Sequence, residues 1–163
     1  MISLNMAAIL SRLGKNVLVV DTDFQAPAVQ DLIAKYCEPY EARLLLPDYL
    51  LAEKRMNIND MIVELKGADA QFHVMPAAYP GNVDFEKIGK VLTGAGRGVI
   101  ITIELLRDAL SELMRIYRYD YILVDTTPGT SLTTLFVLFS LSDSIIQLVR
   151  SGALEHYQAA EYM

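Results

Sequence analysis

The sequence predicts an α/β domain in which helices cover both faces of a mostly parallel sheet. Three observations support this fold class. Short β-branched runs alternate with helical apolar patterns, which is the order of elements found in parallel sheets. The runs 17–20 and 121–124 are apolar throughout, as expected of strands that are covered on both faces. Both runs end in a carboxylate, at Asp21 and Asp125.

Helix 2–13 is predicted by apolar residues at helical spacing, and Gly14 is well suited to end it as a C-cap. The β-branched run 17–20 follows as a buried strand. A second helical pattern covers 28–36 and opens after Pro27, a residue that is tolerated in the first turn of a helix.

The middle of the chain carries mixed signals for secondary structure. Pro47 predicts the beginning of a short helix. Asn59 or Asp60 is expected to cap another short helix that continues through Leu65. The run 71–75 then predicts a strand.

The second half returns to regular alternation. Residues 77–98 are rich in loop-forming residues, with a short helix expected at 84–92. Helix 105–117 is amphipathic, because its apolar and charged residues fall on different faces. The remaining elements are expected as a strand at 121–124, a buried helix at 132–141, a strand at 144–149 and a last helix at 154–163.

Composition narrows the class of protein. The 163 residues are enough for one domain with a sizeable core, since 53% are hydrophobic and 21% are charged. The net charge of −6 argues against a broad basic surface for nucleic acid. No apolar stretch approaches the ~20 residues that span a bilayer, and no signal peptide is recognised. The lone Cys37 fits a reducing compartment, so we expect a soluble, cytoplasmic protein.

Other conspicuous side chains are expected to be structural. His73 and His156 lie far apart with no cysteine nearby, so a zinc site has no support. Tyr117, Tyr119 and Tyr121 alternate at strand spacing and are expected to pack against or border the sheet.

The most informative candidate for a functional site is the segment 119–130, where an apolar run ends in Asp125 and a Thr/Pro/Gly turn follows at once. Open α/β sheets bind ligands at the carboxyl ends of their strands. In nucleotide hydrolases, that position holds an aspartate that manages Mg²⁺ beside a turn that contacts the terminal phosphate. Residues 16–25 repeat the strand-then-aspartate pattern. No G-x-x-x-x-G-K-[ST] phosphate loop occurs in the sequence.

Five collinear segments resemble the MinD/ParA ATPases, which are members of the P-loop NTPases. The segments are 4–15, 17–27, 74–77, 119–130 and 142–149. The resemblance implies a partial domain over residues 1–163. The family's lysine-containing phosphate loop would fall just before helix 2–13, and further strands would follow Met163. A misassigned start, a degraded gene and a trimmed polypeptide all remain open as explanations.

The resemblance also implies roles for individual residues. Asp125 and Asp21 would serve Mg²⁺, and Asp23 would orient the attacking water. Gly129 would offer its backbone N–H to the γ-phosphate, with Thr130 beside it at the nucleotide. Two simpler alternatives stay open: Asp125 caps the helix that begins near Thr130, and the two earlier aspartates belong to a solvated turn.

For this chain alone, three aspartates would face a triphosphate with Mg²⁺ as the only counter-charge. We therefore expect weak ATP binding, negligible hydrolysis and no cofactor bound, with Mg²⁺ and ATP as cofactors of the parent protein. The glycine-rich segment 93–98 is expected to be a surface loop, not a substitute phosphate cradle. In the family, a central strand lies between 121–124 and 144–149. Its absence predicts a homodimer or oligomer, or a chain of low stability.

The favoured function is a fragment of a nucleotide-dependent dimerising ATPase that partitions or positions DNA or other cargo. The alternative is a pseudo-ATPase that acts as a binding or scaffolding module without turnover. A dehydrogenase-like domain is disfavoured, because no G-x-G-x-x-G follows a strand. The partner protein is not indicated, and DNA or membrane stays open as the platform of the parent.

Overall fold

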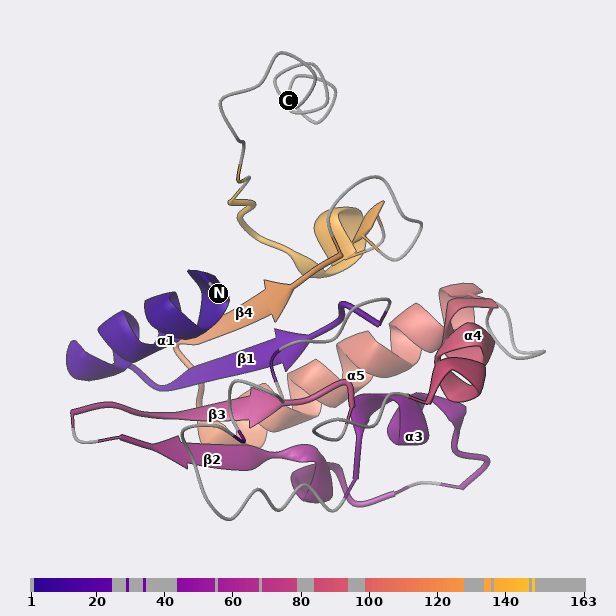
Figure 1. The fold of residues 1–163 in the computed structure, drawn as a ribbon, viewed down its shortest axis with the longest axis horizontal. Helices are drawn as coiled ribbons and strands as arrows, with labels where there is room; N and C mark the ends of the chain where they lie inside the picture. Colours follow the sequence, from indigo (N-terminus) through magenta and orange to yellow (C-terminus); the bar gives the residue numbers. More distant parts are fainter. Residues whose placement is uncertain are drawn as a thin grey trace.

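A four-stranded sheet with the order β2-β3-β1-β4 forms the centre of the molecule (Figure 1). The computed structural model describes residues 2–24, 29, 34, 44–54, 56–67, 69–78, 84–93, 99–127, 134–135, 137–146 and 148. The strands are β1 (Val17–Asp21), β2 (Val63–Lys66), β3 (Gln71–Met75) and β4 (Tyr121–Asp125). β1 runs parallel to both β3 and β4, whereas β2 is antiparallel to β3. The expected mostly parallel sheet is confirmed.

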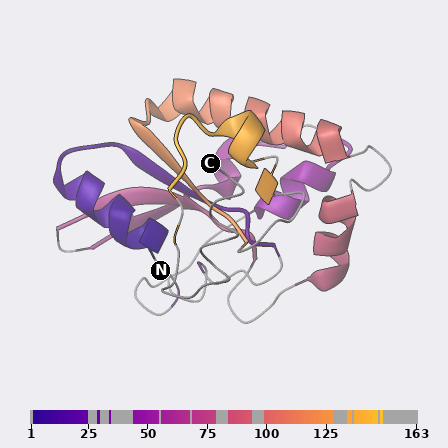
Figure 2. The same ribbon diagram turned by 90° about the horizontal axis from the view of Figure 1, so that it is seen from above.

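Helices cover both faces of this sheet, as expected (Figures 1 and 2). One face packs against α1, and the other packs against α5 together with α3. The described helices are α1 (Ile2–Arg12), α3 (Leu46–Leu51), α4 (Phe85–Thr93), α5 (Val99–Tyr117), the 3₁₀ helix η1 (Ile58–Met61) and the π-helical turn η2 (Val137–Leu141). α5 is longer than expected, because it already begins at Val99.

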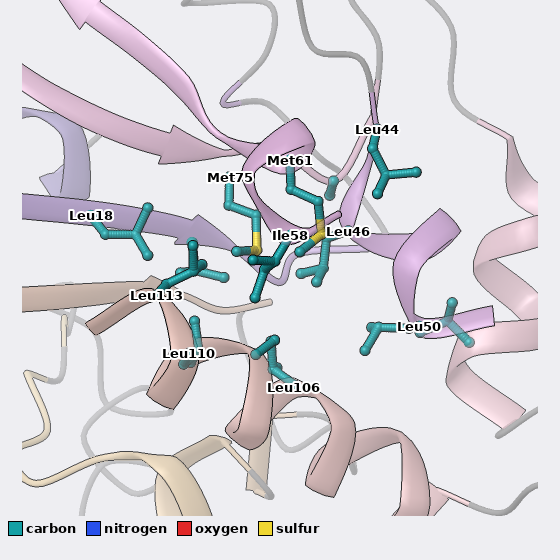
Figure 3. Close-up of a cluster of buried hydrophobic side chains, with 14 of the residues drawn as sticks. Leu18, Leu44, Leu46, Leu50, Ile58, Met61, Met75, Leu106, Leu110 and Leu113 are labelled. Atoms are coloured by element: carbon teal, nitrogen blue, oxygen red, sulfur yellow. The ribbon is translucent and has the colours of Figure 1, made fainter. Parts of the chain in front are cut away.

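The larger core lies between the sheet and α5 (Figure 3). Leu18 of β1 and Met75 of β3 contribute from the sheet, and Leu113 of α5 meets them from the helix layer; all three are fully buried. Leucines of α3 and two residues of η1 close one end of the cluster. Burying each such side chain contributes about 1.5–3 kcal/mol, so this layer holds the strands and α5 in place.

The smaller core lies between the sheet and α1, where Ala7 packs on Val17 and Val19. The Ser11 hydroxyl fixes the far end of α1 to β3, because it donates to the Gln71 carbonyl at 2.7 Å and accepts from the Gln71 N–H at 2.8 Å. Gly14 ends the helix with φ +75°, a conformation that glycine adopts without strain. The expected helix end is therefore confirmed.

Two expectations were wrong within the described residues. The segment up to Leu65 is not one helix: Asn57 caps the short η1, and β2 follows at once. Val63 and Leu65 are buried while the residues between and after them are exposed, a two-residue period that favours a strand. Of the strand expected at 144–149, residues 144–146 and 148 are described, and they are irregular instead of extended in a sheet.

Several expected elements fall wholly or mainly outside the described residues. Of the helix expected at 28–36, Val29 and Ala34 are described, and both are helical. Of the helix expected at 132–141, residues 134–135 are described and helical, and the π-helical turn η2 follows them. The helix expected at 154–163, together with His156 and Cys37, lies outside the described residues.

Candidate functional site

Two of the predicted site residues meet at the carboxyl ends of neighbouring parallel strands. Asp21 ends β1 and Asp125 ends β4, and the two are register partners. Thr22 connects the ends of β1 and β4 by two hydrogen bonds. Its N–H and its hydroxyl both donate to the Asp125 carbonyl, at 2.9 and 2.8 Å. The adjacency is therefore fixed by backbone pairing and does not depend on side-chain conformation.

Both carboxylates project from the sheet face that carries α1. Side chains alternate along a strand, and Val17 and Val19 of β1 pack in the α1 cluster, so Asp21 lies on the same face. On β4, Leu123 packs in that cluster, which places Asp125 there too. α1 runs back along the sheet from the edge where these strands end, so its N-terminus lies near this edge (Figure 1). A helix N-terminus carries a partial positive charge and unpaired N–H groups that attract anions.

Asp21 is the most perturbed carboxyl group at this edge. Its side chain is fully buried. Oδ1 accepts the Asp23 N–H at 3.0 Å, whereas buried Oδ2 has no hydrogen-bond partner in the described part of the chain. Burial raises the pKa of Asp21 to about 7. The backbone N–H groups of Asp23 and Val29 oppose this shift, and the negative charges of Asp125 and Asp23 reinforce it. An uncompensated buried carboxylate oxygen favours a proton or a bound cation.

Asp125 is half-buried, and its pKa is also raised. Burial is the main cause, and the charge of Asp23 adds to it. The Ser3 hydroxyl on α1 lies close enough to lower the pKa of Asp125, although Ser3 Oγ forms no hydrogen bond of normal geometry within the described residues. The charge of Asp23 helps to raise the pKa of both Asp21 and Asp125, and the charge of Asp125 also raises that of Asp21, so the three acidic groups lie close enough to interact.

The chemistry of this donor set fits Mg²⁺. Magnesium prefers oxygen ligands, keeps several waters and takes one or two carboxylates together with phosphate oxygens. Within the described residues, no three His, Cys, Asp or Glu side chains are arranged to hold a metal ion by themselves. Two strand-end carboxylates, one with an unpaired oxygen, therefore suit a metal that shares its ligands with water and phosphate.

The remaining predicted site residues lie outside this description. Gly129 and Thr130 are not among the described residues, and of the glycine-rich segment 93–98 only Thr93 is described. The helix cap considered for Asp125 also falls in that part of the chain. The roles of these residues stay predictions.

Sequence reasoning missed two side chains at this edge. Thr22 joins the two strand ends, and Ser3 approaches Asp125 from α1. The position of a hydroxyl residue between Asp21 and Asp23 could have pointed to Thr22. Nothing in the sequence indicates that Ser3 of the first helix turn lies beside a residue about 120 positions later.

His73 and two of the tyrosines gather elsewhere, near the start of β4. His73 Nδ1 lies 2.6 Å from the Tyr119 hydroxyl, and the ring of Tyr117 stacks on Tyr119 at 5.4 Å between centroids. Burial lowers the pKa of His73 and raises that of Tyr119. These groups pack against the sheet, as expected, and take no part in the carboxylate edge.

A family model described as "AAA domain" matches residues 1–157, which is nearly the whole chain. The chain belongs to this family. Together with the fold, the match confirms the resemblance to MinD/ParA-type P-loop NTPases. No curated protein sequence matches the chain at a significant level.

Solved structures share the fold at low sequence identity. A plasmid partition protein from Borrelia burgdorferi is 19% identical with a TM-score of 0.64, covering 99% of this chain and 64% of that one. Cobyrinic acid a,c-diamide synthase from Mycobacterium smegmatis, with bound ADP and magnesium, is 20% identical with a TM-score of 0.56, covering 82% and 47%. The kinase domain of the Escherichia coli tyrosine kinase ETK is 19% identical with a TM-score of 0.52, covering 78% and 40%.

The chain spans about half the length of these structures, between 40% and 64%. Among the described helices, none combines the length and apolar character that a bilayer-spanning segment needs.

Proposed function

We propose that this AAA domain family chain supplies the metal-handling edge of a MinD/ParA-like ATPase that acts as a nucleotide-dependent dimerising switch in partitioning or positioning. The observation that carries the proposal is the pair Asp21 and Asp125, in register at the ends of adjacent parallel strands, with a buried unpaired oxygen on Asp21. Two proteins that share this fold support the proposal: the plasmid partition protein, and the synthase that binds ADP and magnesium.

Each residue has a distinct role in this proposal. Asp125 and Asp21 would hold Mg²⁺ at this edge, where their negative charges would lower the electrostatic cost of holding the ion. Asp23 accepts a proton or hydrogen bond from the attacking water and so orients it. The N-terminus of α1, with Gly129 and Thr130 after β4, provides N–H and hydroxyl donors for phosphate oxygens. When bound, Mg²⁺ neutralises charge on the phosphates.

The 163-residue chain by itself is proposed to bind MgATP weakly and not to turn it over. No described lysine or arginine side chain contributes to the pKa of Asp21 or Asp125, so among the described residues a triphosphate meets three acidic groups and no lysine or arginine beside them. Calorimetric titration with MgATP, together with a phosphate-release assay, tests this directly. We expect a dissociation constant no tighter than about 1 mM, which is about −4 kcal/mol, and no release above background. Micromolar binding with turnover would overturn it.

A pseudo-ATPase that serves as a scaffold is the second candidate, and the same lack of a lysine or arginine beside the aspartates, among the described residues, favours it. The DNA immediately upstream of the Met1 codon separates the two functions. An in-frame glycine-rich loop with a lysine supports the ATPase, and its absence supports the scaffold. If the loop is present, MgATP hydrolysis by the extended protein, lost on Asp125→Asn, excludes the scaffold.

Homodimerisation of the parent, and DNA or membrane as its platform, belong to the same proposal. The switch requires that MgATP changes the oligomeric state. Sedimentation of the extended protein with and without MgATP measures this. An unchanged sedimentation coefficient would contradict the switch while leaving the hydrolysis result intact.

A further inference from the structure

Thr22 is a buried polar residue whose hydrogen bonds are directed at the main chain of β4. It follows Asp21 directly after the end of β1, and it is 1% exposed. Its N–H and its hydroxyl both donate to one oxygen, the Asp125 carbonyl, at 2.9 and 2.8 Å. Burying a hydroxyl costs free energy unless it forms a hydrogen bond, and a valine would have the same branched shape without that cost. The hydroxyl of Thr22 therefore acts through its bond to the last residue of β4.

The β1 side of this connection is anchored in the larger core. The Thr22 carbonyl accepts the Phe24 N–H at 2.9 Å, and Phe24 is 2% exposed within the cluster between the sheet and α5. Between them, the Asp23 N–H donates to Asp21 Oδ1 at 3.0 Å. The turn after β1 is thus held by its own hydrogen bonds and by the burial of Phe24. It gives Thr22 a fixed base from which to hold β4.

A fixed connection matters at this edge because its carboxylates repel one another. The charges of Asp23 and Asp125 act on Asp21, and the charge of Asp23 also acts on Asp125. Like charges favour a wider separation, and Asp21 with Asp125 is the last pair in the register of β1 and β4. The bonds from Thr22 lie directly beyond that pair. They oppose the repulsion at the point where the ladder ends.

We propose that Thr22 is a positioning residue of this edge: by holding the Asp125 carbonyl, its hydroxyl keeps the Asp125 carboxylate at the distance from Asp21 that suits a hydrated divalent cation. This inference rests on the proposed function, because it requires that the two carboxylates serve a metal. Thr22 acts through the main chain of Asp125 and supplies no ligand of its own. Groups that orient metal-binding side chains contribute to metal affinity without touching the ion.

A matched pair of substitutions separates the hydroxyl from the shape of the side chain. Thr22→Val keeps the branched shape and removes the donor, whereas Thr22→Ser keeps the donor and removes the methyl group. In both variants the N–H of residue 22 still donates to the Asp125 carbonyl, so both are expected to fold. Ser11→Ala is the control for a general loss of stability, because it removes a hydroxyl bond between α1 and β3 at the opposite end of the sheet.

Amide hydrogen exchange without metal measures whether the hydroxyl holds the ends of the strands. The protection of the N–H of residue 22 is divided by that of Val19, in the middle of β1, which removes changes in global stability. This ratio is expected to fall about fivefold in Thr22→Val, the effect of one hydrogen bond, and to stay within about twofold in Thr22→Ser and Ser11→Ala. An unchanged ratio in Thr22→Val would overturn the inference, whatever the metal does.

Mn²⁺ in place of Mg²⁺ measures the consequence for the metal. The Mn²⁺ concentration that halves the amide NMR signal of Asp23 is expected to be about fivefold higher in Thr22→Val than in the natural chain, and nearly unchanged in Thr22→Ser and Ser11→Ala. Equal concentrations for Thr22→Val and Thr22→Ser would overturn the inference and leave the metal edge intact. Broadening of the Asp23 signal that survives Asp125→Asn in the otherwise natural chain would refute the metal edge itself, and the role of Thr22 with it.

Discussion

Replacing Asp21 with asparagine is expected to stabilise the chain at alkaline pH. Burial raises the pKa of Asp21 from 3.8 to about 7. The unfolded chain therefore loses this proton near its ordinary pKa, whereas the folded chain keeps it until about pH 7. Stability falls as the pH rises through this window and is level above it. At about 1.4 kcal/mol for each pKa unit, the loss at pH 8 is up to about 4 kcal/mol.

The asparagine variant does not ionise, and its side-chain oxygen can still accept the Asp23 N–H. Its advantage over the natural chain is expected to grow from about 1–2 kcal/mol at pH 5 to about 4 kcal/mol at pH 8. In urea, an advantage of that size moves the unfolding midpoint by about 1–3 M. Circular dichroism during urea titration at both pH values, with EDTA present, measures the difference.

Asp108→Asn provides the control, because Asp108 is an exposed carboxylate on α5. Its effect should stay within about 0.5 kcal/mol at both pH values. Two results would contradict a raised pKa of Asp21. Either Asp21→Asn differs from the natural chain by the same amount at pH 5 and pH 8, or the variant is the less stable protein at pH 8.

Four further predictions concern the structure that carries this edge. Tyr119→Phe removes the hydrogen bond to His73 and should cost about 1 kcal/mol. Because burial lowers the pKa of His73 below 6.5, stability that is complete above pH 6.5 should fall as the pH drops, and His73→Phe should abolish this slope in urea titrations. Leu113→Ala, in the larger core, should cost about 2–5 kcal/mol, against at most about 1 kcal/mol for the neighbouring half-exposed Met114→Ala; equal costs would contradict the packing. Ser11→Ala should lower the free energy of unfolding by about 1–2 kcal/mol, and no change in the melting temperature would mean that Ser11 does not fix α1 to β3.

The strands β1 and β4 and the long helices could be predicted from sequence because their signals are local. β1 and β4 are continuous apolar runs that end in aspartate, and α1 ends at a glycine that adopts a positive φ. β2 was missed because it has only four residues and its two-residue period emerges only when it pairs with β3. The antiparallel pair closes through the Gly67 N–H to Ala70 carbonyl bond, a turn that the sequence does not single out.

Long-range pairing explains the other differences. Residues 144–149 favour a strand in composition, but a strand requires a neighbour to supply its hydrogen bonds, and none of the described residues pairs with this segment. In the candidate site, the sequence predicted that Asp21 and Asp125 would lie at one edge. Their one-to-one register and the bridging bonds from Thr22 link positions 103 residues apart, which local patterns cannot determine.

Paramagnetic Mn²⁺, used in place of Mg²⁺, tests most directly whether the strand-end carboxylates handle a metal. This chain is not expected to retain a metal, but in its amide NMR spectra even weak, transient contact with Mn²⁺ should broaden the signals of Thr22, Asp23 and Thr126 first, and leave Lys15 and Gln71 at the opposite end of the sheet sharp. The broadening should disappear in Asp125→Asn. Broadening that is strongest at other acidic positions, or that survives this substitution unchanged, would contradict a metal site at this edge.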